Sequence, residues 1–204
     1  MSTITKRGAP LLEKAVLGFI AGFAAAIGAL DSVFLIGRIV ALAGAGPTEL
    51  PNVPLADPAP ADLGDSSAIV SATYHYVTLV VADLPDSARA ALIAATVLSS
   101  LLTVGICAAV VWLCLRVFVG RPFVRSATTG ISVVAILVLL AGLGGPFLRG
   151  IANTEAVAIA GYDGLALLLF DVDLAPLGWA FALIVVAAAF EIGQRLQRET
   201  EGLV

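Results

Sequence analysis

The stretch Ala88–Val119, ARAALIAATVLSSLLTVGICAAVVWLCLRVFV, decides the fold of this chain, because no charged residue occurs between Arg89 and Arg116. A helix that crosses the hydrocarbon core of a bilayer needs about 20 mostly apolar residues. Backbone groups that face lipid must satisfy their own hydrogen bonds, which favours a helix over other structures. The stretch therefore predicts a transmembrane helix, and its excess length predicts tilt or projection beyond the membrane.

Three further apolar stretches lead to the same interpretation, at about residues 11–45, 127–148 and 174–193. Across the 204 residues, 60% are hydrophobic and only 13% are charged, and the mean hydropathy is +1.04. Soluble domains carry about twice that share of charge, roughly 25%. We therefore expect an all-α membrane protein, with residues 1–204 forming a single four-transmembrane-helix bundle whose first partner is the lipid bilayer.

Basic residues divide the ends of these stretches into two classes. Eight of the eleven Lys and Arg residues lie at the start of the first stretch, around the link between the second and third, or after the fourth: Lys6, Arg7, Lys14, Arg116, Arg121, Arg125, Arg195 and Arg198. The two other connections, 46–87 and 149–173, are mainly acidic. The positive-inside rule then places both termini and the tail 194–204 in the cytoplasm, and both loops outside. We expect a multi-pass protein of the cell (inner) membrane.

A cleaved signal peptide is the alternative for the first stretch, because Ala41-Leu42-Ala43 resembles a cleavage site. The stretch is far longer than the apolar core of a signal peptide, however, and Asp31 and Arg38 interrupt it. We therefore favour a retained transmembrane helix.

The two outer loops contain segments with the composition of strands. Ala72–Val81 is rich in aromatic and β-branched residues, and residues 156–160 and 165–170 flank the turn-like sequence Gly161-Tyr162-Asp163-Gly164. We expect a small three-stranded extracytoplasmic sheet formed from both loops, because a lone hairpin is only marginally stable. The Pro-rich residues 44–64 are expected to be extended and partly mobile.

Small residues predict two features of the helices. Gly18 and Gly22 form a small-xxx-small pair, which permits close helix approach. We favour packing within one chain over dimerisation, and a homo-oligomer is the alternative. Glycines at 142, 144 and 145, followed by Pro146, are expected to weaken the outer end of the third helix.

Asp31 and Arg38 are the candidate intramembrane polar site. They are seven residues apart and so fall near one helix face. Ionisable side chains inside a membrane span often mark an ion path or a binding site. The favoured interpretation is a structural charge pair or an interface anchor, in which Arg38 extends toward water. The alternative is a role in transport.

Catalytic and metal-binding patterns are not found in the sequence. His75 is the single histidine, and a zinc site needs several ligands, although Asp171 and Asp173 would approach it if the strands pair. Cys107 and Cys114 are about 10 Å apart along one helix, too far for a disulfide. No Walker loop, G-x-S-x-G or H-E-x-x-H occurs. We expect no enzyme activity, no cofactor and no metal site, and the few basic residues predict no direct nucleic-acid binding.

The expected inner face carries the candidate residues for partner docking: Arg121, Phe123, Glu191, Gln194 and Arg195. Arg195 also follows Glu191 at the i+4 spacing of a helix-surface ion pair. Two motifs lie here, Gly120-Arg121-Pro122-Phe123 and the ending from Phe190-Glu191 to Leu203-Val204. With them the chain resembles the bacterial membrane family called domain of unknown function 2975. The chain departs from that family at residues 126–129, where members have an Asn and further basic residues. The resemblance implies four spans and a membrane partner in a regulatory pair, and it implies no catalytic residue.

Two functions from different classes follow from the sequence. The leading hypothesis is a non-enzymatic bacterial integral membrane protein that acts as a sensor or regulatory partner, or as a scaffold. Its partner would be a membrane or cytoplasmic regulatory protein bound at the inner face. The alternative is a small transporter or channel subunit, which would require Asp31 and Arg38 to line a cavity.

Overall fold

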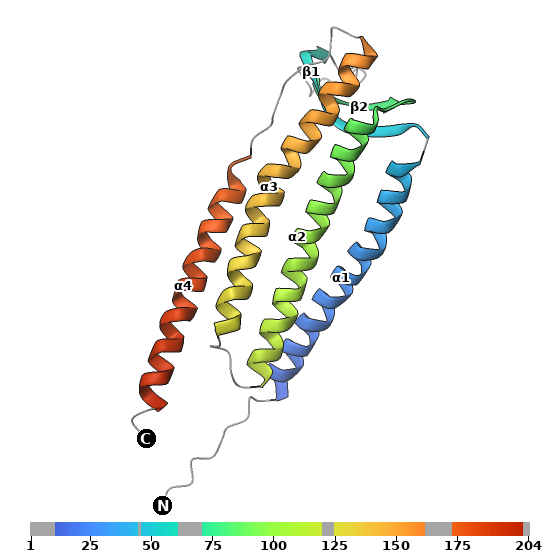
Figure 1. Cartoon of the computed structure of the whole chain (residues 1–204). Helices are drawn as coiled ribbons and strands as arrows, with labels where there is room; N and C mark the ends of the chain where they lie inside the picture. The colour runs from blue at the N-terminus through green and yellow to red at the C-terminus, as the bar shows by residue number, and fades with distance from the viewer. Residues whose placement is uncertain (1–10, 45, 61–70, 120–124, 162–172, 202–204) are drawn as a thin grey trace, which may run out of the picture. The chain divides into compact units, whose positions relative to one another are not determined.

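The computed structural model describes residues 11–44, 46–60, 71–119, 125–161 and 173–201. Within these residues the elements are α1 (Leu11–Ala43), β1 (Thr48–Pro60), β2 (Thr73–Val81), α2 (Asp86–Phe118), α3 (Arg125–Ala160) and α4 (Ala175–Glu201) (Figure 1). All four helices are long and apolar enough to cross a membrane. The sequence prediction of four such helices is therefore confirmed, and α4 extends beyond the predicted stretch into the charged tail.

The chain divides into two compact units. The first, which we call the helical unit, contains the described residues up to 35, those from 99 to 141, and those from 174 onward. The second, which we call the ribbon unit, contains residues 36–98 and 142–173. Helices α1, α2 and α3 contribute residues to both units, whereas α4 belongs to the helical unit alone.

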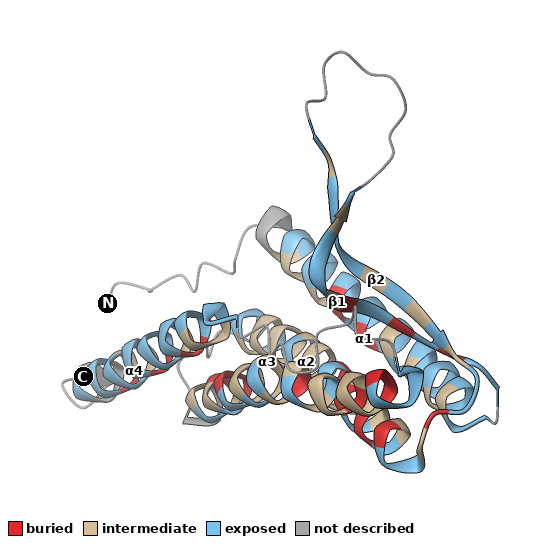
Figure 2. Ribbon diagram, turned by 90° about the horizontal axis from the view of Figure 1, so that it is seen from above, coloured by how far each residue is buried: buried red, intermediate tan, exposed pale blue. Residues whose placement is uncertain are grey.

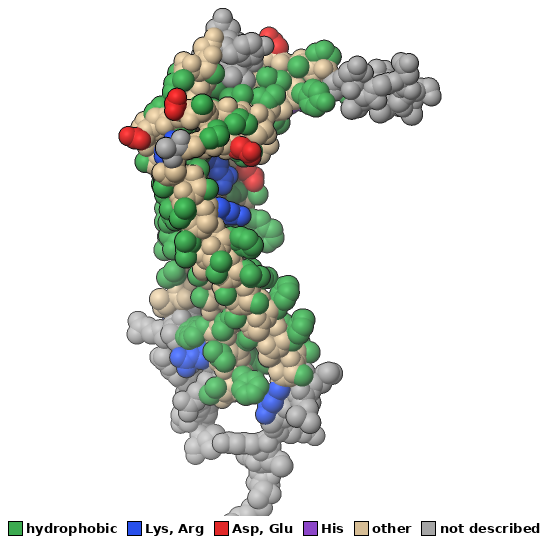
Figure 3. Space-filling view, turned by 90° about the vertical axis from the view of Figure 1, so that its right-hand side faces the viewer, with side chains coloured by type: hydrophobic (Ala, Val, Ile, Leu, Met, Phe, Trp, Pro, Cys, Tyr) green, Lys and Arg blue, Asp and Glu red, His purple; other side chains and the backbone are tan. Residues whose placement is uncertain are grey.

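In the helical unit, α1 and α4 each bury one narrow stripe. On α1 the buried and half-buried positions recur every three or four residues, at Lys14, Leu17, Ala21, Ala24, Gly28, Asp31 and Leu35. On α4 the buried positions are Ala180, Ala187 and Gln194, seven residues apart. Both spacings select one face of a helix. The remaining surface is exposed and largely apolar (Figures 2 and 3).

Close approach of α1 to α2 occurs at Gly28. A Cβ atom at this position would lie 3.2 Å from Cys107 Cβ, which is tighter than ordinary van der Waals contact. At Gly18 and Gly22 an added Cβ would meet nothing within 4 Å, so the expectation that this pair packs within the chain is wrong. The physical reason is helical phase, because the buried stripe passes through Ala21 and Ala24 and leaves both glycines beside it.

Helix α3 continues through the Gly- and Pro-rich segment that was expected to weaken it. A Cβ at Gly144 would lie 3.1 Å from Leu98 Cδ2, so the small residues here let α3 approach α2. The helix reaches Ala160, and Gly161 follows with a φ of +59° and donates its N–H to the Val157 carbonyl oxygen. Gly161 is thus a left-handed C-terminal cap.

The strand predicted at residues 156–160 is therefore wrong, because these residues are the last turns of α3. Ala152, Ala156 and Val157 are buried there at helical spacing, and their packing overrides the weak β-propensity of the local sequence. The strand predicted at 165–170 lies outside the described residues.

The ribbon unit contains an antiparallel pair of strands, β1 and β2. Strand β2 confirms the prediction for residues 72–81, whereas its partner β1 lies in the Pro-rich segment that was expected to be extended and partly mobile without pairing as a strand. Prolines occur in strands only where a backbone N–H is not needed for pairing, and both strands of a two-stranded sheet are edges. The register shifts between Leu50 and Val53, where Asn52 has a φ of +60°. This bulge places Leu50 and Val53 on the same buried side.

The ribbon is anchored on the start of α2 and the end of α3 (Figure 1). Its core contains Leu50, Val53, Leu84, Ala88, Ala91, Ala152, Ala156 and Val157. A lone pair of strands is marginally stable in water and needs further apolar surface. In the described part of the chain, two helix ends supply that surface.

Candidate functional site

Asp31 lies on the interior stripe of α1, within the helical unit. Its Oδ2 atom is buried and has no hydrogen-bond partner among the described residues, while the neighbouring Ser32 hydroxyl donates to the Gly28 carbonyl oxygen at 2.8 Å. Ser100 of α2 is only 2% exposed, and its Oγ also has no partner in the described part of the chain. The helical unit thus contains two unsatisfied buried oxygen atoms, which native interiors rarely tolerate.

Arg38 belongs to the ribbon unit, so the two residues predicted to form one site are in different units. It lines a pocket of about 420 Å³ at which four elements converge. The lining residues are Arg38, Ala41 and Leu42 of α1, Glu49, Leu50 and Pro51 of β1, Leu92 and Thr96 of α2, and Arg149 and Asn153 of α3. We call this the arginine pocket.

A second pocket, of about 740 Å³, shares Pro51, Arg149 and Asn153 with the first. It is also lined by His75 and Tyr76 of β2 and by Asp173, and we call it the histidine pocket. Asp173 and His75 both line this pocket, whereas Asp171 lies outside the described residues. Among described residues no group of three or more His, Cys, Asp or Glu side chains could hold a metal ion.

Arg149 and Asn153 are the residues that sequence reasoning missed. They are four residues apart on α3 and so share one face of the helix, where they border both pockets. The signal was present, because Arg149 is one of the few basic residues in a connection that is otherwise acidic. The predicted end of the third helix near residue 148 placed Arg149 and Asn153 in a loop, so their position on one helix face was missed.

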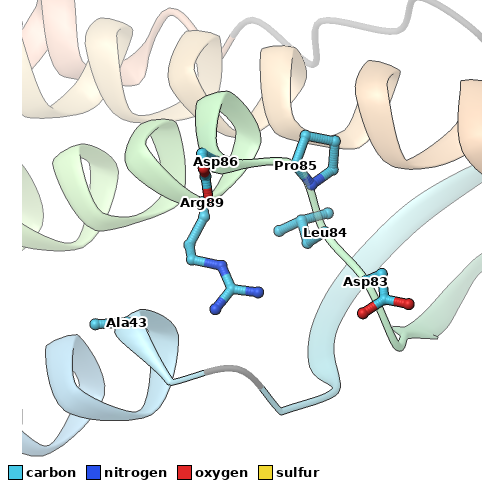
Figure 4. Close-up of a pocket in the computed structure, with 6 residues that line it drawn as sticks. All are labelled: Ala43, Asp83, Leu84, Pro85, Asp86 and Arg89. Atoms are coloured by element: carbon cyan, nitrogen blue, oxygen red, sulfur yellow. The ribbon is translucent and has the colours of Figure 1, made fainter.

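Arg89, at the start of α2, forms a hydrogen bond with the residue that follows the end of α1. Its Nη1 group donates to the carbonyl oxygen of Gly44, the residue after α1, and the arginine points toward Ala43 across a pocket of about 530 Å³ (Figure 4). The last carbonyl groups of a helix lack intrahelical partners, and a cation near them is favourable. Ser87, also at the start of α2, donates its Oγ–H to Glu155 Oε2 of α3 at 2.6 Å. Both contacts hold the ribbon unit together.

The residues proposed for partner docking divide into three groups. Arg121 and Phe123 lie outside the described residues. Glu191 and Arg195 are exposed on α4. Gln194 is 8% exposed, and its Nε2 donates to the Thr128 hydroxyl oxygen of α3 at 2.9 Å. Gln194 therefore joins two helices inside the unit, and Glu191 and Arg195 are the described residues of this set that remain exposed.

Comparison of the chain with models of protein families, with curated proteins and with solved structures finds no match. The resemblance to domain of unknown function 2975 stays a prediction.

Proposed function

We propose that this chain is a non-enzymatic integral protein of a bacterial inner membrane that acts as a sensor or regulatory partner. The observation that carries the proposal is the ribbon unit, which has its own apolar core and two open pockets that share the polar residues Arg149 and Asn153. Binding sites are concave, with a few polar groups among apolar ones. A passive anchor would not require such a unit, whereas a receptor for a small ligand would.

The direction of signalling follows from chain connectivity and charge. Helices α1, α2 and α3 each continue without a break from the ribbon unit into the helical unit. The distribution of basic residues supports cytoplasmic termini and an extracytoplasmic ribbon unit. A ligand bound at the pockets would then act on helices whose opposite ends are cytoplasmic. Glu191 and Arg195 would contact a regulatory partner, and ligand binding would change that contact.

The docking surface can be tested by photo-crosslinking in native membranes. A photoreactive amino acid at position 195 is expected to crosslink one discrete protein, because Arg195 is exposed on the polar end of α4. The same reagent at Val185, which is 68% exposed on the apolar part of α4, is the matched control and should yield no such product. A chain truncated after Gly193 should lose the partner, and partner sets identical to those of the full chain would contradict the proposal.

A transporter or channel subunit is the second candidate function. It is favoured by one observation, the unsatisfied buried oxygens of Asp31 and Ser100 in the helical unit. Intramembrane carboxylates of this kind occur in ion and proton pathways. If this function holds, proteoliposomes with the wild-type chain will conduct protons or small cations, and Asp31→Asn will abolish the flux. Flux no greater than that of empty liposomes rules this function out.

A further inference from the structure

The arginine pocket is lined by two arginines from different helices. Arg38 lies in the last two turns of α1, and Arg149 lies on the part of α3 within the ribbon unit. Neither forms an ion pair with a carboxylate in the described part of the chain. Glu49 is the single acidic residue of the pocket lining, so the lining carries an excess of one positive charge.

Two neighbouring polar side chains differ in what they can offer a ligand. The Thr96 hydroxyl already donates to the Leu92 carbonyl oxygen at 2.8 Å, which leaves its oxygen as an acceptor. The Asn153 side chain has an amide group that can donate, and it borders the pocket beside Arg149. The available donors are therefore two guanidinium groups and one amide. Guanidinium groups recognise phosphate and carboxylate oxygens through paired N–H donors.

The rest of the lining is apolar. Ala41 and Leu42 come from the end of α1, Leu92 from the beginning of α2, and Leu50 from β1. Helices α1 and α2 are both candidate membrane spans. The α1 span ends at Ala43 and the α2 span begins at Asp86, close in sequence to the residues that line the pocket. A ligand that fits such a lining has an anionic group beside an apolar part, and it approaches from the plane where lipid headgroups meet acyl chains.

We propose that the arginine pocket binds the phosphate group of an anionic phospholipid. Arg38 and Arg149 hold the phosphate, Asn153 donates to it, and the lipid glycerol and the first carbons of an acyl chain lie against Leu42 and Leu92. The shared border at Arg149 and Asn153 leaves room for the headgroup to extend into the histidine pocket, toward His75 and Tyr76. This site rests on the proposed function and deepens it, because it makes the lipid composition of the membrane the sensed quantity.

The test uses the full chain, purified in neutral detergent and analysed by native mass spectrometry with added phosphatidylglycerol or phosphatidylcholine. The wild-type protein is expected to retain one phosphatidylglycerol in preference to phosphatidylcholine. Arg38→Gln and Arg149→Gln should each weaken that binding about tenfold or more, since a charge-assisted hydrogen bond is lost. Arg195→Gln is the matched control, because Arg195 is exposed on α4 and lines none of these pockets.

A variant that retains Arg38 and Arg149 separates loss of binding from an effect of the charge changes on folding. Ala41→Trp is expected to fill the pocket and to reduce phosphatidylglycerol binding while Arg38 and Arg149 remain. Phosphatidylglycerol binding by Arg38→Gln/Arg149→Gln equal to that of Arg195→Gln would overturn the site. Displacement of the lipid by an equal concentration of inorganic phosphate would overturn the lipid assignment in favour of a soluble anion. Lipid retention and partner crosslinking are separate measurements, so failure of this site leaves the crosslinking result at position 195 to decide the proposed function.

Discussion

Val53→Asp is expected to unfold the ribbon unit. Val53 is 0% exposed and packs in the core that joins β1 to the ends of α2 and α3. An isolated carboxylate in such a core costs several kcal/mol, because it loses its hydration and gains no partner. The stability of a whole domain is only about 5–15 kcal/mol. We therefore expect the ribbon to detach from the two helices.

The matched control for this change is Val80→Asp. Val80 belongs to β2 of the same ribbon and is 63% exposed, so the same substitution should be tolerated there. Limited proteolysis and hydrogen exchange of residues 48–98 measure the result. Both tryptophans, Trp112 and Trp179, lie in the helical unit, so their fluorescence reports whether that unit is intact. Equal protease resistance of the two variants would show that Val53 is not a core residue.

Long apolar stretches and local composition explain why much of the fold could be predicted. A helix of bilayer length is specified by hydropathy alone, and all four helices were found on this basis. The aromatic and β-branched residues of β2 were equally informative. Strand β1 could not be predicted, because its prolines oppose a strand in isolation. Its pairing depends on an edge position and on the bulge at Asn52, which are tertiary features.

The candidate site was harder to predict than the fold, because it depends on where elements end. Arg38 was identified from its charge, but its neighbour Arg149 required α3 to pass Pro146. A proline inside a helix removes one hydrogen bond, and packing of Gly144 against Leu98 at this level favours continuation. Gln194 was assigned to the surface although it lies seven residues after the buried Ala187. A periodicity test extended into the charged tail would have placed it on the interior stripe.

Gly28→Leu is expected to force α1 away from α2 in the helical unit. The Cβ alone would lie 3.2 Å from Cys107 Cβ and 3.8 Å from Cys107 Sγ, and leucine adds three further carbon atoms at this contact. Overpacking of this kind typically costs about 1–3 kcal/mol. The higher helix propensity of leucine offsets about 1 kcal/mol at most. The change should also widen access to the Cys107 thiol, which is free and half-buried.

Gly22→Leu separates the effect of packing from that of helix propensity. Gly22 is on the same helix, and an added Cβ there meets nothing within 4 Å, so this variant should be as stable as the wild type or slightly more stable. Unfolding of both variants in mixed detergent micelles, followed by circular dichroism, measures the difference, and the rate of Cys107 modification by a small thiol reagent gives a second readout. A faster modification rate in Gly28→Leu alone places the α1–α2 contact at Gly28. If instead Gly22→Leu is the destabilised variant, the small-xxx-small face of α1 is packed against another chain, and a homo-oligomer becomes the preferred state.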